Sequence, residues 1–254
     1  MNARMPIANS ILLISMSIGL SSSMATAGDQ SDGGFAVVEL FTSEGCSSCS
    51  PADRLLSDLV VGSQTDGKRV YPLAYHVDYW DYIGWKDPFA RPEFTQRQRR
   101  YAQVFRLSSI YTPQMIVNGS KEFVGSDKSE LRKALGSALG ASSVPAIGLH
   151  TLPVQDNLVR VEYNLTNSPT SKTLNLALVE RNLQSRVGRG ENSGRTLLHN
   201  NVVRDWKEIV GSSESGSVDL KIPGDAKLEN ISIVAFLQDP ETMRIYAAAM
   251  LALP

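Results

Sequence analysis

The chain has 254 residues, of which 42% are hydrophobic and 20% are charged, and its formal net charge is −1. This composition is typical of a globular protein and excludes a disordered chain. The near-neutral charge argues against a nucleic-acid-binding protein, which normally carries a basic surface. With only two cysteines, the chain is not a small domain held together by several disulfides.

The first residues of the sequence indicate export. Arg4 precedes a short apolar run that ends at Leu20, and Ala25-Thr26-Ala27 matches the small residues of a signal-peptide cleavage site. The apolar run is about ten residues long, roughly half of what a membrane-spanning helix needs. We expect a signal peptide at residues 1–27, with an uncleaved anchor as the alternative. The mature chain would then have no membrane span and would be secreted into a compartment where disulfides persist.

The next part of the chain predicts an α/β domain over residues 28–144. Apolar runs at Phe35–Phe41 and Val70–Val77 predict buried strands. Helices with apolar residues on one face are predicted at Pro92–Phe105 and Ser129–Leu139. Asn118-Gly119 between two apolar runs predicts a β-hairpin. The order of these elements predicts a mixed central sheet flanked by helices, with an insertion around residues 78–107.

Two cysteines three residues apart follow the first predicted strand and open a helix. Pro51 is tolerated only near the first turn of a helix, so Cys46 and Cys49 are expected close to the helix N-terminus. There, unpaired N–H groups and the helix dipole lower the pKa of a thiol. In such a pair the first cysteine faces solvent and the second lies beneath it, close enough to resolve a mixed disulfide. The spacing favours redox chemistry, and a structural disulfide or a metal site remain as alternatives.

The remainder of the chain predicts a second, all-β domain that resembles a sandwich and covers residues 145–254. Short strands separated by turn residues are predicted at Ala146–Thr151, Leu158–Asn164, Thr173–Glu180, Gly216–Ile222, Ile231–Gln238 and Ile245–Leu253. Residues 188–196 predict a long flexible hairpin rather than a phosphate-binding loop. Its arginines, which include Arg189 and Arg195, would form a basic loop able to contact a partner.

Together these features resemble the thioredoxin superfamily. The resemblance lies in the strand-CxxC-helix unit at Val37–Leu56, in Thr112-Pro113 just before a strand, and in the Asn118-Gly119 hairpin that precedes the last helix. More narrowly, residues 42–49 (Thr-Ser-Glu-Gly-Cys-Ser-Ser-Cys) look like a secreted bacterial thioredoxin-like family of unknown function with a β-rich C-terminal domain. That likeness implies a Gram-negative periplasm as the location.

The resemblance also implies an activity and a set of roles. The protein would be a thiol–disulfide oxidoreductase that reduces, oxidises or isomerises disulfides of proteins or small molecules, together with a redox partner. Cys46 would attack the substrate disulfide and Cys49 would resolve the mixed disulfide. Pro113 would lie in cis beside the sulfurs, and Thr112 and Tyr111 would bind a substrate strand. No dissociable cofactor is implied, because the cysteine pair is its own redox centre.

Glu39 lies in an otherwise apolar predicted strand, seven residues before Cys46. Relatives place a buried acid at a similar point, which implies that Glu39 exchanges protons with Cys49. The alternative is a salt-bridged or edge carboxylate, because the spacing is one residue longer here and strand alternation would turn Glu39 outward.

Two other functions compete with the redox interpretation. The first is a periplasmic copper carrier, in which His76 or Met115 would join the two cysteines around Cu(I). The second is a non-catalytic binding module on a thioredoxin fold. No zinc site is expected, because two thiolates without a convincing third ligand bind zinc poorly. The aromatic residues of the insertion could border a substrate groove, or could form a small core of their own: Tyr79, Trp80, Tyr82, Trp85 and Phe89.

Overall fold

The computed structural model describes Met1 and residues 26–27, 33–142 and 145–253. The expected signal peptide therefore lies outside the described residues, apart from Met1 and the two-residue strand β1 (Thr26–Ala27), which pairs antiparallel with β6 (Ala146–Thr151). Within the described ranges, no helix is both long enough and apolar enough to cross a membrane.

The N-terminal part consists of strands and helices in the predicted order. Its elements are β2 (Ala36–Thr42), η1 (Ser47–Cys49), α1 (Ser50–Asp66), β3 (Val70–His76), η2 (Asp81–Ile83), α2 (Pro92–Phe105), β4 (Gln114–Val117), β5 (Lys121–Val124) and α3 (Lys128–Leu139). The predicted Asn118-Gly119 turn is confirmed, because β4 and β5 pair antiparallel on either side of it. Both turn residues have positive φ angles, 49° and 61°, which this residue pair adopts readily.

The C-terminal part is rich in strands, as predicted. Its elements are β6, β7 (Leu158–Thr166), β8 (Thr173–Glu180), β9 (Leu183–Arg186), β10 (Thr196–His199), β11 (Val202–Val210), β12 (Ser215–Lys221), η3 (Leu228–Asn230), β13 (Ile231–Gln238) and β14 (Ile245–Ala252). All six predicted strands are present. The predicted hairpin is also confirmed, because β9 and β10 pair antiparallel around residues 187–195. β11 was not predicted.

The missed strand β11 joins the two parts of the chain into one sheet. It pairs parallel with β3, through Val202 and Ala74, and antiparallel with β8 along most of its length. The result is an eight-stranded sheet in the order β14-β13-β8-β11-β3-β2-β4-β5. A second sheet has the order β1-β6-β7-β12. The two parts are therefore continuous through hydrogen-bonded strands and are not linked by the chain alone.

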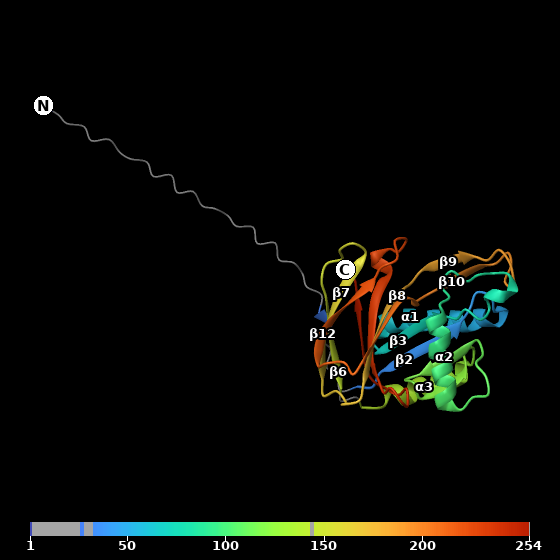
Figure 1. Ribbon diagram of the computed structural model, residues 1–254, viewed down its shortest axis with the longest axis horizontal. Helices are drawn as coiled ribbons and strands as arrows, with labels where there is room; N and C mark the ends of the chain where they lie inside the picture. The colour runs from blue at the N-terminus through green and yellow to red at the C-terminus, as the bar shows by residue number, and fades with distance from the viewer. Residues whose placement is uncertain (2–25, 28–32, 143–144, 254) are drawn as a thin grey trace.

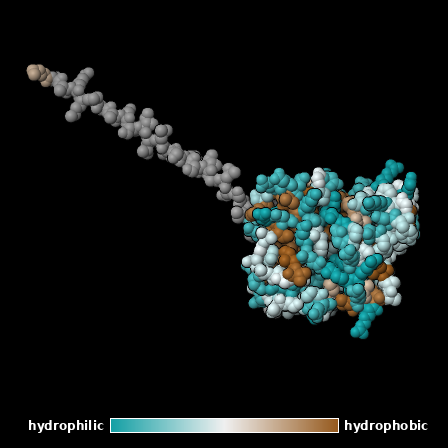
Figure 2. Space-filling view, viewed as in Figure 1, coloured by the Kyte–Doolittle hydropathy of each residue, from teal (hydrophilic) through white to brown (hydrophobic). Residues whose placement is uncertain are grey.

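Different elements pack on the two faces of the large sheet. On one face, the aromatic residues of α2 pack with Phe41, Tyr75 and Phe236 in a shared apolar core. On the other face, α1 and α3 cover β2 and β4, and the smaller sheet covers β8, β13 and β14. Figure 1 shows the smaller sheet at one side of the molecule and the helices at the other. Figure 2 shows that most of the visible surface is hydrophilic, with a narrow hydrophobic band over the β-rich part.

Candidate functional site

Cys46 and Cys49 form a disulfide where β2 turns into α1. Their Cα atoms are 5.4 Å apart. Four residues connect the end of β2 to η1, and α1 then begins at Ser50 with Pro51 in its first turn. Because proline lacks an N–H, it fits the first turn, where that donor would have no helical partner. The predicted placement of both cysteines at a helix N-terminus is therefore confirmed.

The exposure predicted for the first cysteine is wrong. Cys46 is only 1% exposed and Cys49 is fully buried, whereas Ser47 and Ser48 between them are exposed. The cover over Cys46 is the hairpin tip, which we define as residues 187–195, between β9 and β10. The hydroxyl of the exposed Ser48 lies 3.4 Å from the Cys46 sulfur.

The hairpin tip is hydrogen-bonded to the segment that contains the disulfide. The side-chain amide of Asn192 donates to the carbonyl oxygens of Glu44, at 2.8 Å, and Cys46, at 3.2 Å. The carboxylate of Glu191 accepts a hydrogen bond from the backbone N–H of Ser47 at 3.0 Å. Gly190 lies directly against Ile83, where an added Cβ would meet that side chain at 3.0 Å. The predicted basic loop thus packs, through its own tip, on the cysteine pair.

The peptide bond between Thr112 and Pro113 is cis, as expected from the resemblance. Trp80 connects this loop to the disulfide segment. Its indole N–H donates to the Thr112 hydroxyl at 2.7 Å, and its Cβ lies 3.0 Å from the position that a Cβ on Gly45 would occupy. Thr112 and Pro113 are therefore held on the same side of the molecule as the cysteines.

Tyr111 is hydrogen-bonded to neighbouring elements. Its hydroxyl donates to Glu122 of β5 at 2.7 Å, and its carbonyl oxygen accepts a hydrogen bond from Gln98 of α2. Of the aromatic residues in the insertion, Tyr79 and Trp80 pack on the core beneath α2 and Phe89 packs on the core beneath α1. Tyr82 differs, with 81% of its surface exposed.

Glu39 is not brought to the disulfide. Strand alternation places it on the α2 face of the sheet, with Val37 and Phe41, whereas α1 covers the opposite face. Its carboxylate accepts hydrogen bonds from the Arg97 guanidinium, at 2.6 Å, and from the Tyr101 hydroxyl, and the ion pair is almost completely buried. The alternative interpretation, a salt-bridged carboxylate, is therefore the one that the geometry supports.

A different set of titratable side chains lies next to the cysteine pair. This His–carboxylate cluster consists of Glu44, Asp53, His76, Asp87 and His199. His76 Nδ1 lies 2.7 Å from the carboxylate of Asp87, and His199 Nε2 lies 3.0 Å from that of Glu44. The two imidazole rings touch edge to face, with centroids 4.9 Å apart. The Glu44 carboxylate also accepts a hydrogen bond from the Trp85 indole at 2.8 Å.

Burial and neighbouring charge shift the pKa values in this cluster in different directions. Burial raises the pKa of Asp53, although His199, His76 and a hydrogen bond from Thr42 oppose that shift. Burial by itself would lower the pKa of His76, but the adjacent Asp87 carboxylate outweighs burial and raises it. The pKa of Asp87 is lowered, because His76 and two backbone N–H donors overcome its burial. The cluster therefore contains a histidine–carboxylate pair in which the pKa of the histidine is raised and that of the carboxylate is lowered, and, beside it, a carboxyl group with raised proton affinity.

The residues proposed for a copper carrier are engaged elsewhere. Met115 is fully buried in the core beneath α1 and α3, and His76 is paired with Asp87. Across the described parts of the chain, no group of three or more His, Cys, Asp or Glu side chains has an arrangement that could hold a metal ion.

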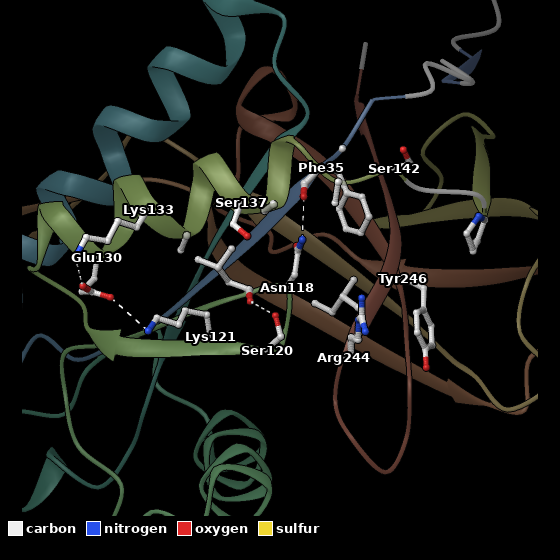
Figure 3. Close-up of a pocket in the computed structure, with 17 residues that line it drawn as sticks. Phe35, Asn118, Ser120, Lys121, Glu130, Lys133, Ser137, Ser142, Arg244 and Tyr246 are labelled. Carbon is white, nitrogen blue, oxygen red and sulfur yellow. Dashed lines mark hydrogen bonds and ion pairs between the residues drawn. The ribbon is translucent and has the colours of Figure 1, made fainter.

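A cavity of about 590 Å³ opens at the other end of β2, between α3, the β4–β5 turn and β14 (Figure 3). Lys121 and Lys133 lie on its rim and both point toward Glu130, with which they form ion pairs at 3.4 and 2.8 Å. Its walls include Phe35 and Ile245. None of the sequence-predicted site residues lines this cavity.

Sequence reasoning missed most of the site that surrounds the disulfide. No local pattern in the sequence assigns a role to Glu44, His199, Asp87, Glu191 or Asn192. The scarcity of histidine, three in the chain, was the one available signal for His199. Its partner Glu44 lies in the loop before Cys46, whereas His199 ends the remote strand β10, and no local pattern reveals that the two meet.

Comparisons with known proteins agree with this fold. A crystal structure of an Agrobacterium tumefaciens protein is 28% identical in sequence, covering 85% of this chain and 93% of that one, with a TM-score of 0.62. A domain of the outer membrane lipoprotein Omp28 from Porphyromonas gingivalis is 15% identical over 44% of this chain and 88% of its own, and its TM-score of 0.29 is too low to support an argument. No curated protein is similar enough to count as a relative. A family model described as "Protein of unknown function (DUF1223)" matches residues 37–238, and the chain therefore belongs to the DUF1223 family.

Proposed function

We propose that this protein is a thiol–disulfide oxidoreductase whose N-terminal part has a thioredoxin-like arrangement, with Cys46 and Cys49 as its redox centre. The observation that carries the proposal is the Cys46–Cys49 disulfide at the start of α1, on the same side of the molecule as the cis Thr112–Pro113 bond. The strand order β3-β2-β4-β5 supports it, because β2 and β3 are parallel and the β4–β5 hairpin is followed by α3.

The proposed reaction is an exchange of one disulfide for another. The Cys46 thiolate attacks a sulfur of the substrate disulfide, which releases one substrate thiolate that takes up a proton. The Cys49 thiol then loses its proton and attacks the Cys46 sulfur, which re-forms the Cys46–Cys49 bond and releases the second substrate thiolate. Two electrons pass from the cysteine pair to the substrate. The reverse sequence oxidises a substrate dithiol.

We assign the proton exchange with Cys49 to Asp53 in place of Glu39. Asp53 lies four residues after Cys49, so the two side chains occupy the same face of the helix. Thr42 donates a hydrogen bond to the Asp53 carboxylate at 2.8 Å and fixes its direction. The Asp53 side chain is partly exposed, and its raised pKa means that it accepts a proton more readily than an ordinary aspartate.

Access to the Cys46 sulfur requires the hairpin tip to move. A substrate would approach over the exposed Ser47 and Ser48, and Thr112 would border its path. Export into an oxidising compartment, the periplasm in a Gram-negative cell, is part of the proposal, because a disulfide persists there.

The decisive experiment measures the redox potential of the cysteine pair and the behaviour of single-cysteine variants. A potential above about −280 mV would fall in the range of catalytic pairs, and one below about −300 mV would indicate a structural disulfide and contradict the proposal. Cys46→Ser is expected to abolish turnover of a disulfide substrate, whereas Cys49→Ser is expected to accumulate mixed disulfides. Small and equal effects of the two substitutions would also contradict it. Stoichiometric Cu(I) binding that is lost in Cys46→Ala would also contradict the proposal and would favour the copper carrier.

A further inference from the structure

We propose that Glu191 is a positioning residue that stabilises the disulfide form of Cys46–Cys49 over its dithiol form, so that the pair is an electron donor. The use of this bias in catalysis rests on the proposed function. The bias itself is a property of the cysteine pair and can be measured separately.

The carboxylate of Glu191 is held at a defined place beside Cys46. It accepts a hydrogen bond at 3.0 Å from the backbone N–H of Ser47, the residue that follows Cys46 and begins η1. The next residue, Asn192, is 1% exposed and is bonded to two carbonyl oxygens of the same segment. Asn192 thus fixes the backbone next to Glu191, and the Glu191 side chain itself is exposed.

The other charged groups around Cys46 have hydrogen-bond or ion-pair partners of their own. Glu44, from the segment itself, faces His199 of β10, and Asp87, from the insertion, faces His76 of β3. On α1, Asp53 accepts a hydrogen bond from Thr42, and in the hairpin tip the Arg195 guanidinium donates to the Asn192 side-chain oxygen. Glu191 differs from Glu44 and Asp87, because its partner is a backbone N–H that carries no full positive charge.

Glu191 is ionised at neutral pH. Hydrogen bonds from the side chain and the backbone N–H of Ser47 lower its pKa below the usual range. A full negative charge therefore lies next to the residue whose sulfur must become a thiolate. The same carboxylate also accepts the hydrogen bond of one N–H group at the start of the helix. Free N–H groups at that position otherwise stabilise a thiolate.

The consequence for redox equilibrium follows from charge. When a dithiol reduces the pair, the Cys46–Cys49 bond breaks, the dithiol gives up two electrons and becomes a disulfide, and its two protons pass to the cysteines. Any ionisation of the Cys46 thiol then sends a proton to solvent and leaves a thiolate beside Glu191. The disulfide carries no charge and is not repelled. Glu191 therefore disfavours the reduced form and lowers the redox potential.

The test compares the wild-type protein with Glu191→Gln, Glu191→Asp and the control Glu241→Gln. Glu241 lies in the β13–β14 turn, near Met243, which touches the β4–β5 turn at the opposite end of β2 from the cysteines. Each protein is equilibrated in mixtures of reduced and oxidised dithiothreitol, and its free thiols are counted by alkylation after acid quenching. The pKa of the Cys46 thiol is followed in the reduced proteins by its thiolate absorbance.

Glu191→Gln is expected to shift the equilibrium constant about threefold toward the reduced form, which is about 14 mV at 29.6 mV per tenfold change. The pKa of Cys46 should fall with it. Glu191→Asp keeps the charge and should stay close to wild type, as should Glu241→Gln. The shift should shrink in about 1 M salt, where the screening length is about 3 Å.

An equilibrium constant of Glu191→Gln equal to that of the wild type would overturn the inference. Equal shifts in Glu191→Gln and Glu191→Asp would also overturn it, because they would point to a lost contact and not to charge. The equilibrium is read on the cysteine pair itself, so it is valid even if no substrate is turned over. Conversely, turnover combined with an unchanged Glu191→Gln potential would reject the role of Glu191 alone.

Discussion

Asn192 donates its side-chain amide to the main-chain oxygen of Cys46 at 3.2 Å, although the two residues are 146 positions apart in the sequence. The same amide donates to the carbonyl oxygen of Glu44 at 2.8 Å. Since Asn192 is 1% exposed, these bonds form out of contact with water. The disulfide is thus covered by a buried polar contact from the β-rich part of the chain.

Asn192→Ala is expected to expose the disulfide. The substitution removes the side-chain donor of the Glu44 carbonyl oxygen, whereas the Cys46 carbonyl oxygen keeps the backbone N–H of Cys49, and we expect it to lower the free energy of unfolding by about 2 kcal/mol. The Cys46–Cys49 bond should be reduced several times faster by a phosphine reductant under native conditions, which thiol labelling over time would measure. Asn164→Ala, at an exposed position of β7, is the matched control. A reduction rate equal to that of wild type would show that the hairpin tip does not limit access.

Substitutions in the Glu39–Arg97 pair are expected to lower the stability of the protein and to leave the redox potential of the cysteine pair unchanged. Arg97→Met leaves the Glu39 carboxylate buried without its counter-charge and should cost about 3–5 kcal/mol in urea unfolding. The double variant Glu39→Gln/Arg97→Met should recover part of this loss. Arg160→Met breaks an exposed pair with Asp219 and should cost no more than about 1 kcal/mol. A changed potential in Glu39→Gln would restore the proton-exchange role that the resemblance implied.

The His76–Asp87 pair predicts a pH dependence of stability. Because the folded pKa of His76 is raised above 6.5, its contribution is complete below that pH and is lost as pH rises through the folded value. The folded pKa of Asp87 is lowered below 3.8, so its contribution is present above that pH and is lost as pH falls further. The difference in unfolding free energy between wild type and His76→Gln should therefore be largest between about pH 4 and 6.5 and decrease at higher pH.

Urea unfolding at several pH values measures this difference. His150→Gln is the control, because His150 pairs with the half-exposed Glu162 on β6 and β7. A His76→Gln difference that stays constant up to pH 9 would contradict a raised pKa at His76.

Local signals were sufficient for most elements of the fold. The α2 helix has the predicted boundaries, Pro92 and Phe105, because a proline starts it and its apolar residues recur on one face. β11 was missed because a bulge between Val203 and Asp205 interrupts its alternation and charged residues follow. Since β11 is the strand that joins the two parts, one missed element concealed the continuous sheet.

The site was less predictable than the fold, because its residues meet only in three dimensions. The spacing of Cys46 and Cys49 placed them correctly at a helix N-terminus, but their burial depends on Asn192 from a distant hairpin. Glu39 could have been placed from the sequence. Strand alternation puts it with Val37 and Phe41, away from the face that α1 covers.

Asp53→Asn is expected to raise stability while it slows disulfide exchange. The raised folded pKa of Asp53 means that its contribution to stability is complete below pH 3.8 and is lost as pH rises through the folded value. At neutral pH the ionised Asp53 side chain destabilises the folded state. Asparagine removes the charge and keeps an oxygen that accepts the Thr42 hydrogen bond. The loss of the proton acceptor for Cys49 should slow mixed-disulfide resolution several-fold in stopped-flow exchange with a model disulfide.

Asp58→Asn, on the exposed side of the same helix, should change neither stability nor exchange rate. Greater stability combined with slower exchange is typical of a residue retained for function. A variant Asp53→Asn that is less stable at neutral pH and exchanges at the wild-type rate would instead identify Asp53 as a structural partner of Thr42. The proton acceptor for Cys49 would then have to be sought in the remaining cluster, where Glu44 and His199 form the pair connected directly to the disulfide segment.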